Sequence, residues 1–230
     1  MKKYKVILID VPWLYRDKAR AGKRGCEFQY PCLSMEDLRR LPMGILTEKD
    51  SVIFMWATFP MLNNALELIK CWGFKYVTGG FTWVKTNKDG SIFMGMGAAG
   101  SRSNAEVCLM ARKGKGVKRV HKGIPNTQLH PRLKHSEKPK KFREDIEKLF
   151  GDVSRVEIFA RDRALGWSSI GLDIDGRNIR EVLREAQADN MVDNLAQAVG
   201  VPRKYIDGSN GGTPLQPMIK KIIEKEEGNG

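Results

Sequence analysis

The sequence has few cysteines and histidines, and neither residue type is arranged for a structural bridge or a metal site. The chain of 230 residues contains three histidines and four cysteines, the latter being Cys26, Cys32, Cys71 and Cys108. No two cysteines have C-x-x-C spacing, and the histidines cluster between His121 and His135 without ligands at metal-binding spacing. The sequence therefore predicts reduced thiols and no bound metal.

Long apolar runs and acidic residues are also in short supply. The longest early apolar run, Val6 to Ile9, is too short for a signal peptide or a membrane-spanning helix. The chain has 27 Asp+Glu against 40 Lys+Arg, a net charge of +13. Such an excess indicates a polyanionic partner. We expect a soluble cytoplasmic protein that binds nucleic acid, and the sequence leaves a homodimer open.

Apolar runs alternate with amphipathic stretches along the first 160 residues or so. Residues Tyr4–Ile9 are apolar and β-branched, the pattern of a strand buried on both faces in a parallel sheet. Further strands are predicted at Ser51–Ala57, Lys75–Lys85, Ala105–Ala111 and Arg155–Ala160, and helices at Pro60–Trp72 and Lys138–Phe150. This alternation predicts a doubly wound α/β sheet.

The end of the chain has a different character. We divide the sequence into a domain at 1–188 and a helical C-terminal extension at 189–230, which ends in a charged helix at Met218–Glu227. Residues Leu195–Pro202, with Ile206, have the spacing of a helix-turn-helix start. Ordinary packing of a helix on a loop explains the same spacing equally well.

Two long loops interrupt the predicted sheet. Thr86–Asn104 is rich in Gly and Ser, and Arg112–Arg143 holds twelve Lys+Arg with one acid, Glu137. Long loops between sheet elements are often functional and can line a cleft. We expect phosphate contacts from Arg102 in the first loop and nucleic-acid contacts from Lys113, Lys115, Lys118 and Arg119 in the second. A merely solvated loop is the alternative.

The tetrapeptide Asp10-Val11-Pro12-Trp13 follows the first predicted strand directly. It therefore lies at the carboxyl end of the sheet, where open α/β folds bind their ligands. Other sequence elements accompany it in order: Tyr30-Pro31, Leu41-Pro42, Trp56, Trp72-Gly73-Phe74, Trp83 to Asn87, Gly95 to Gly97, Arg102, Glu106, His135 to Pro139, Glu157 to Arg161, Trp167 and Gly171.

Through these elements, over roughly residues 4–176, the chain resembles the METTL-type (MT-A-seventy) adenine N6-methyltransferases. The signature tetrad of that family is Asp-Pro-Pro-Trp, and this chain has Val11 at its second position. The resemblance implies a permuted Rossmann-like fold that uses S-adenosylmethionine. It also makes Asp10, Val11, Pro12 and Trp13 the catalytic residues of a methyltransferase domain.

The chemistry of an exocyclic amine explains the tetrad. The lone pair of the adenine amine is delocalised into the ring, so the nitrogen needs acceptors that favour its pyramidal form. The Asp10 carboxylate and the carbonyl of Val11 or Pro12 are suitable acceptors. Trp13 would offer a flat face for the base, while Tyr30 and Lys85, from the matching motifs, are further expected substrate contacts.

The resemblance also implies cofactor contacts. Lys138 would meet the methionine carboxylate, Arg161 would reach the ribose, and Asp10 would contribute from the tetrad. An Asn-Gln pair that holds the ribose hydroxyls in relatives is replaced here by Leu172 and Asp173. Asp173 can still accept hydrogen bonds from vicinal hydroxyls, as an acidic residue does in dinucleotide-binding folds.

These expectations combine into adenine N6-methylation of DNA by a bacterial or phage enzyme. RNA is the alternative substrate. A nucleic-acid-binding module that has lost turnover is a second alternative, which Val11 and Leu172 permit. A further minority interpretation places the cofactor against Phe93–Gly97, which mimics an F-x-G-x-G loop but precedes a predicted strand rather than a helix.

Overall fold

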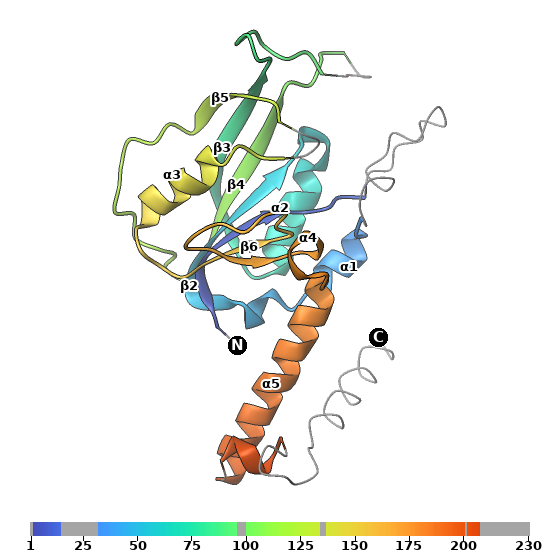
Figure 1. Cartoon of the computed structure of the whole chain (residues 1–230), viewed down its shortest axis with the longest axis vertical. Helices are drawn as coiled ribbons and strands as arrows, with labels where there is room; N and C mark the ends of the chain where they lie inside the picture. Colours follow the sequence, from blue (N-terminus) through green and yellow to red (C-terminus); the bar gives the residue numbers. More distant parts are fainter. Residues whose placement is uncertain (1, 15–31, 96–99, 134–136, 201, 208–230) are drawn as a thin grey trace.

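A seven-stranded sheet forms the centre of the protein (Figure 1). The computed structural model describes residues 2–14, 32–95, 100–133, 137–200 and 202–207. Its strands are β1 Tyr4–Asp10, β2 Thr47–Ala57, β3 Lys75–Thr86, β4 Ala105–Lys113, β5 Thr127–Pro131, β6 Arg155–Ile158 and β7 Ser168–Ile170. They are ordered β5-β3-β4-β2-β1-β6-β7 across the sheet. The predicted α/β class is confirmed.

The sheet is mixed, with parallel and antiparallel pairs of strands. β1 runs parallel to β2 and β6, as predicted for a doubly buried strand, and β3 is parallel to β5. Only β4 is antiparallel to its neighbours β2 and β3. No helix separates β3 from β4 in the described part of their connection, so β4 returns beside β3 as a hairpin partner.

Helices cover both faces of the sheet. They are α1 Met35–Arg39, α2 Leu62–Cys71, α3 Lys141–Phe150, α4 Leu172–Asp175 and α5 Ile179–Val199, with 3-10 turns η2 Met43–Ile45, η3 Phe59–Met61 and η4 Arg203–Tyr205. Ser34 caps α1 by accepting from the backbone N–H of Asp37. Within the described ranges, no helix has both the length and the apolar character needed to cross a membrane.

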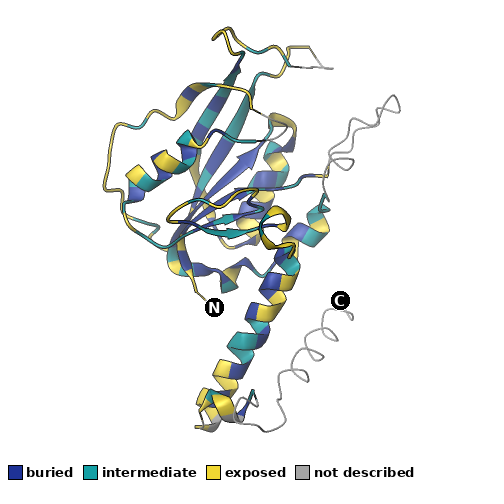
Figure 2. Ribbon diagram, in the orientation of Figure 1, coloured by how far each residue is buried: buried dark blue, intermediate teal, exposed yellow. Residues whose placement is uncertain are grey.

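Successive side chains of the central strands point to opposite faces of the sheet, and the helices that they contact cover those faces. Ile7 and Ile9 of β1 belong to the core cluster that α1, α2 and the start of α5 cover. Val6 and Leu8 point the other way, into an aromatic cluster with Phe54 that α3 covers. Figure 2 shows the buried residues concentrated in the sheet between these layers. The sheet is thus buried on both sides at β1, and its strand ends remain for binding.

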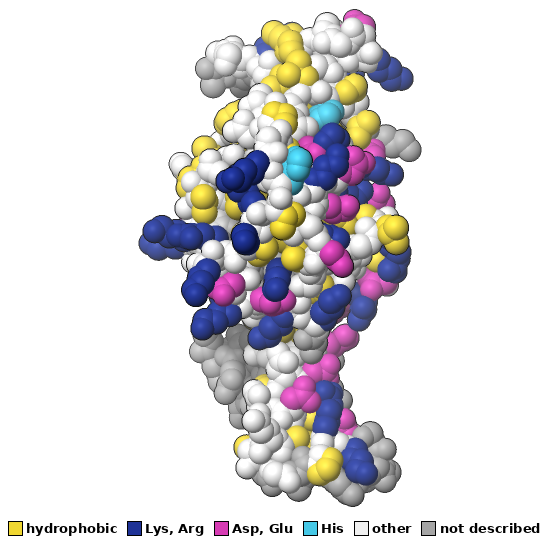
Figure 3. Space-filling model, turned by 90° about the vertical axis from the view of Figure 1, so that its left-hand side faces the viewer, with side chains coloured by type: hydrophobic (Ala, Val, Ile, Leu, Met, Phe, Trp, Pro, Cys, Tyr) yellow, Lys and Arg dark blue, Asp and Glu magenta, His cyan; other side chains and the backbone are white. Residues whose placement is uncertain are grey.

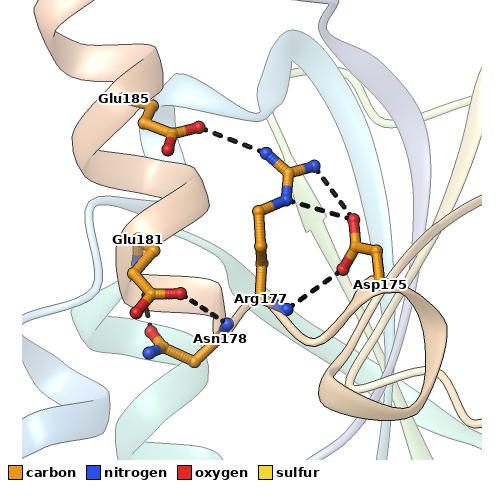
Figure 4. A network of polar contacts seen from close by, with 5 residues as sticks. All are labelled: Asp175, Arg177, Asn178, Glu181 and Glu185. Atoms are coloured by element: carbon orange, nitrogen blue, oxygen red, sulfur yellow. Dashed lines mark hydrogen bonds and ion pairs between the residues drawn. The ribbon is translucent and has the colours of Figure 1, made fainter.

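Helix α5 extends from the sheet domain as a projecting rod (Figure 1). It begins with a capping box in which Asn178 and Glu181 satisfy each other's backbone N–H groups. Arg177 joins the preceding turn to the helix through Asp175 and Glu185 (Figure 4). The helix is continuous across 188 and 189, where we place the division between domain and extension.

The proposed helix-turn-helix start falls at the far end of this rod. Helix α5 ends at Gly200, whose φ of 70° makes it a left-handed cap, and one 3-10 turn, η4, follows Pro202. Arg203 of that turn pairs with Asp189, Asp193 and Asp207. Its guanidinium is therefore engaged within the protein, which favours ordinary helix-loop packing here. The predicted helix at Met218–Glu227 lies outside the described residues.

Candidate functional site

The tetrad lies at the carboxyl end of β1, between the ends of β2 and β6. The chain continues from β1 to β2 on one side, whereas β6 joins β1 from the other side after α3. A change of direction of this kind is where open α/β sheets bind ligands. Asp10 is half-buried beside Trp56 of β2, and the structure therefore confirms its expected place at the strand end.

The backbone of the tetrad forms a tight turn. The N–H of Trp13 donates to the carbonyl of Val11 at 2.9 Å, and the N–H of Leu33 donates to the carbonyl of Pro12 at 3.0 Å. Each carbonyl oxygen keeps a second lone pair for another donor. Either carbonyl can therefore still accept from a substrate amine.

Trp13 is placed differently from our expectation. Its side chain is 4% exposed and belongs to the larger core cluster, whereas a stacking platform needs an open ring face. Among the described residues near this edge, Phe59 does expose its ring, being 53% exposed in the turn directly after β2. The sequence did not single out Phe59, because one aromatic residue next to a proline carries no distinguishing pattern.

A chain of alternating charges extends from Asp10 across the strand ends. The Lys138 ammonium donates to Asp10 Oδ2 at 2.7 Å and lies 3.4 Å from Glu106 Oε2. The other Glu106 oxygen accepts from the Lys85 ammonium at 2.5 Å. β4 starts at this edge because it runs antiparallel, and its reversed direction brings Glu106 into the site.

The charges in this chain stabilise one another against the cost of burial. Burial alone would raise the pKa of Glu106, but Lys138 and Lys85 outweigh it, so the pKa lies below its ordinary value. Burial would lower the pKa of Lys138, yet Asp10 and Glu106 raise it above its ordinary value. Lys138 is therefore a permanent cation and Glu106 a permanent anion near neutral pH.

Aromatic rings lie beneath both ammonium groups. Lys138 Nζ is 5.6 Å from the ring centroid of Trp56, and Lys85 Nζ is 5.0 Å from that of Trp83. Cation–π attraction at these distances adds to the ion pairs and limits where the two lysine heads can move. The site is thus polar on its open side and aromatic on its floor.

The structure brings Lys138 together with Asp10, two residues that we assigned to different parts of the reaction. Lys138 was expected to hold a cofactor carboxylate and Asp10 an amine. In the structure the two side chains neutralise each other directly. A ligand with a carboxylate would compete with Asp10 for Lys138, and its binding would release an oxygen of Asp10.

The expected cofactor residues Arg161 and Asp173 lie on the β6 and β7 side of the tetrad. Both are exposed, as is Leu172 beside them at the start of α4. Among the non-glycine residues that the structure describes, Phe159 alone has a positive φ, 60°, directly after β6. Backbone of this kind is costly and tends to occur at binding sites.

Close backbone packing shapes the same corner. A Cβ at Gly171 would overlap the carbonyl oxygen of Ala160, so only glycine fits between the ends of β6 and β7. The backbone N–H of Ala160 donates to Ile170 at 3.0 Å. The exposed residues Arg161 and Asp173 thus follow a corner whose backbone is fixed, next to the strand end that carries the Asp10–Lys138 pair, which suits a ligand with an amino-acid end and ribose hydroxyls.

Behind this corner, Glu157 of β6 forms a partly buried ion pair. Arg143 of α3 donates to Glu157 at 2.8 Å and to Asp162 at 2.8 Å. Burial raises the pKa of Glu157 despite the opposing effect of Arg143. The pair ties α3 to the strand that leads to Arg161.

The predicted basic residues do not gather at the tetrad. In the register of the sheet, Lys113 of β4 lies opposite Ser51 in the first half of β2, whereas Asp10 of β1 lies opposite Trp56 near the end of β2. Lys113 and Lys115 therefore lie toward the opposite end of the sheet from Asp10, and their expected contacts with nucleic acid stay a prediction. Lys118 and Arg119 are exposed in the loop that follows.

Other predicted residues have mixed outcomes. Lys85 lies in the charge chain, and Arg102 is exposed in the connection between β3 and β4, beyond the carboxyl edge of the sheet. Tyr30 lies outside the described residues. After Phe93 the next described element is the strand β4, as expected, rather than the helix that an F-x-G-x-G cofactor loop precedes.

Glu106 is the main residue that our sequence analysis left without a role. It belongs to a matching motif, but nothing in its spacing shows that it faces two lysines. The antiparallel register of β4 is what places Glu106 between these lysines. Across the described ranges, no group of three or more His, Cys, Asp or Glu side chains is arranged to hold a metal ion.

Comparison with known proteins gives consistent results. The MT-A70 family model matches residues 4–173. The chain is 31% identical over 209 residues to "Type II methyltransferase M.MunI" of Mycoplasma sp, which covers 82% of this chain and 84% of the relative.

Two eukaryotic relatives are more distant and much longer. A "Probable N(6)-adenosine-methyltransferase MT-A70-like" of Oryza sativa subsp. japonica is 28% identical over 93% of this chain. The "N(6)-adenosine-methyltransferase catalytic subunit METTL3" of Homo sapiens is 27% identical over 76% of this chain. The chain spans 29% of the length of each. With a family model that matches most of its length and a tetrad at the switch point of its sheet, the chain belongs to the MT-A70 family.

Proposed function

We propose that this protein transfers a methyl group from S-adenosylmethionine to the N6 amine of adenine in DNA. The methyltransferases of its family use S-adenosylmethionine as methyl donor. The observation that carries the proposal is the position of Asp10, held by Lys138 at the carboxyl end of β1. DNA is favoured because the type II methyltransferase aligns over 84% of its own length, whereas the adenosine methyltransferases align over less than a third.

The cofactor, when bound, supplies an electrophilic methyl group. Lys138 would hold its carboxylate, Arg161 and Asp173 would contact its ribose, and Asp10 would lie between it and the base. The residues present fit this role, because the corner between β1 and β6 combines both signs of charge with a fixed backbone. Transfer then depends on placement in line with the amine, and no covalent enzyme intermediate is needed.

The tetrad holds the amine. One Asp10 oxygen and the carbonyl of Val11 or Pro12 accept the two N–H groups, which directs the nitrogen lone pair toward the methyl group. Pro12 stiffens the turn that presents these acceptors. Val11 is compatible with this role, because only its backbone carbonyl is used. Since Trp13 is buried, the exposed ring of Phe59 is the better candidate for contact with the base.

Methyl-labelled S-adenosylmethionine tests the proposal directly. The protein is incubated with matched adenine-containing DNA and RNA, and the digested nucleosides are analysed by mass spectrometry. Label in N6-methyldeoxyadenosine supports the DNA assignment, and label only in N6-methyladenosine moves the substrate to RNA. Absence of label together with absence of cofactor binding by calorimetry would leave a nucleic-acid-binding module without turnover.

Substitution of Asp10 tests its role. Asp10→Ala is expected to abolish transfer while cofactor affinity stays within a few fold of the wild-type value. The control is Asp152→Ala, which removes a fully exposed carboxylate from the turn before β6. Retained transfer in Asp10→Ala refutes the amine-holding role.

A further inference from the structure

A stretch of chain without any acidic residue crosses the protein from the far end of the sheet to the catalytic edge. Residues 112–132 contain no Asp or Glu and seven Lys or Arg: Arg112, Lys113, Lys115, Lys118, Arg119, Lys122 and Arg132. The stretch leaves the end of β4, passes α3 and returns along β5 (Figure 1). We call these seven side chains the basic track.

The cations of the basic track have no internal counter-charge. Within the part of the chain that the structure describes, none of the seven takes part in an ion pair; Lys113 donates to the hydroxyl of Thr47, and Arg132 stacks on Phe93 at 4.5 Å. Six of the seven side chains are exposed, Lys113 being half-buried. Figure 3 faces this margin of the molecule and shows Lys and Arg side chains across its middle, with Asp and Glu side chains of other elements among them.

The backbone of the track is held in place. Val117 and Ile124 pack against the aromatic core, and the N–H of Val120 donates to the carbonyl of Leu149 in α3 at 2.8 Å. The Asp50 carboxylate accepts from the backbone N–H of Lys115 at 2.7 Å. Apolar residues thus anchor the loop to the domain while its charged residues point outward, which distinguishes it from a loosely solvated loop.

The ends of the track differ in their distance from the tetrad. Arg132 lies beside the catalytic edge, since its N–H donates to the carbonyl of Thr86 at the end of β3. Lys113 lies five residues along β4 from Cys108, which is level with Trp56 and hence with Asp10. At the rise of a strand this is about 17 Å, or about five nucleotides at 3.4 Å per step.

We infer that the basic track binds the phosphate backbone of DNA that flanks the target adenine, and that its part remote from the tetrad, from Lys113 to Arg119, contributes only when the flank is longer than about five nucleotides. The inference rests on the proposed function for the identity of the target. The binding of a polyanion by a strip of unpaired cations does not depend on methyl transfer. The track positions the nucleic acid and carries no sequence information.

The test compares two sets of lysine and arginine substitutions. The track variant changes Lys113, Lys115, Lys118 and Arg119 to Gln, and the matched control changes Arg40, Lys70, Arg184 and Lys204 to Gln, which are exposed at the end of α1, on α2, on α5 and on η4. Both variants lose four positive charges. A second track variant, Lys118→Gln with Arg119→Gln and Lys122→Gln, touches only exposed side chains and covers the case in which the first one folds poorly.

Binding is measured by fluorescence anisotropy between 50 and 200 mM salt. The probes are a 20-base-pair DNA duplex with a central adenine and a six-nucleotide strand with the adenine in the middle. For the long duplex, wild-type affinity should fall roughly 100-fold more across this salt range than that of the track variant, since four phosphate contacts change the logarithmic slope by about 3.6. For the six-nucleotide strand the two proteins should match.

The outcomes separate this inference from the proposed function. If the salt dependence of DNA binding has the same slope in the track variant and in the charge-matched control, the basic track does not bind the phosphates. An equal effect on the short and the long probe overturns the inference as well. The protein can also methylate neither DNA nor RNA while the track variant shows a weaker salt dependence of binding. That result would support phosphate binding by the track and refute the proposed methyl transfer.

Discussion

Glu106 connects the two lysines of the site, and its replacement by Gln tests the charge chain. The change keeps the shape of the side chain and removes one negative charge between two ammonium groups at 2.5 and 3.4 Å. In Glu106→Gln the side-chain amide also presents an N–H donor where both neighbours are already donors. The variant therefore leaves Lys85 and Lys138 partly uncompensated.

The expected loss of stability follows from burial. Removing one partner of a buried ion pair costs about 3 to 5 kcal/mol. The Glu106 side chain is 13% exposed, and its partners are 15% and 23% exposed, so some solvent compensation remains. We expect the free energy of unfolding to fall by about 2 to 3 kcal/mol, which moves a urea midpoint by roughly 1 M.

The assay is urea unfolding followed by circular dichroism at two pH values. A carboxyl group whose pKa is lowered by folding stabilises the protein above its unfolded pKa of about 4.5, and this contribution is lost as the pH falls through the folded value. The difference between wild type and Glu106→Gln should therefore be full at pH 7 and shrink below pH 4.

A surface control and a double mutant complete the test. Glu67→Gln removes an exposed ion pair with Arg39 and should cost less than about 1 kcal/mol. The double mutant Glu106→Gln, Lys85→Met should recover about 1 kcal/mol relative to the sum of the single changes. If Glu106→Gln were no less stable than Glu67→Gln at pH 7, the electrostatic account of the site would be wrong.

Three further predictions concern other parts of the structure. Gly171→Ala should lower the melting temperature, since the added methyl overlaps the backbone of Ala160, at a cost of about 1 to 3 kcal/mol measured by thermal unfolding. Asn178→Ala should lower the free energy of unfolding by about 1 kcal/mol, because it removes the N-cap of α5. Asn178→Asp should keep most of the stabilisation by this cap, and urea unfolding measures both variants. Burial raises the pKa of the Cys108 thiol well above its ordinary range, so this thiol should react with a disulfide reagent only after unfolding, while exposed Cys71 reacts in the native protein.

The sequence predicted the long elements well and the short ones poorly. The strand expected at Tyr4–Ile9 is β1, and the helix expected from Lys138 begins at Lys141 as α3. β5 and β7 were not predicted, because segments of five and three residues show no clear period. The part of α5 from 189 onward falls within the predicted helical extension, but its first half, from Ile179, was not predicted, since its burial pattern depends on contacts that local spacing does not reveal.

The site was predicted in part, for a similar physical reason. Asp10 and Lys138 were identified by motif, and the structure places them in direct contact. Glu106 and the remote position of Lys113 both depend on the direction of β4, and a run of apolar residues does not show which way its strand runs. Pairing register is a property of the whole sheet, so only the three-dimensional arrangement provides it.

The reversed strand β4 has a consequence for evolution as well as for geometry. It carries Glu106 at the catalytic edge and Lys113 at the start of the basic track, and hydrogen bonds to β2 and β3 fix the spacing between them. β4 thus fixes the separation between the edge that carries Asp10 and the start of the basic track. Inserting one residue would turn the alternating side chains beyond it to the opposite face. On the proposed function, the length of β4 therefore sets how far the basic track lies from the target base.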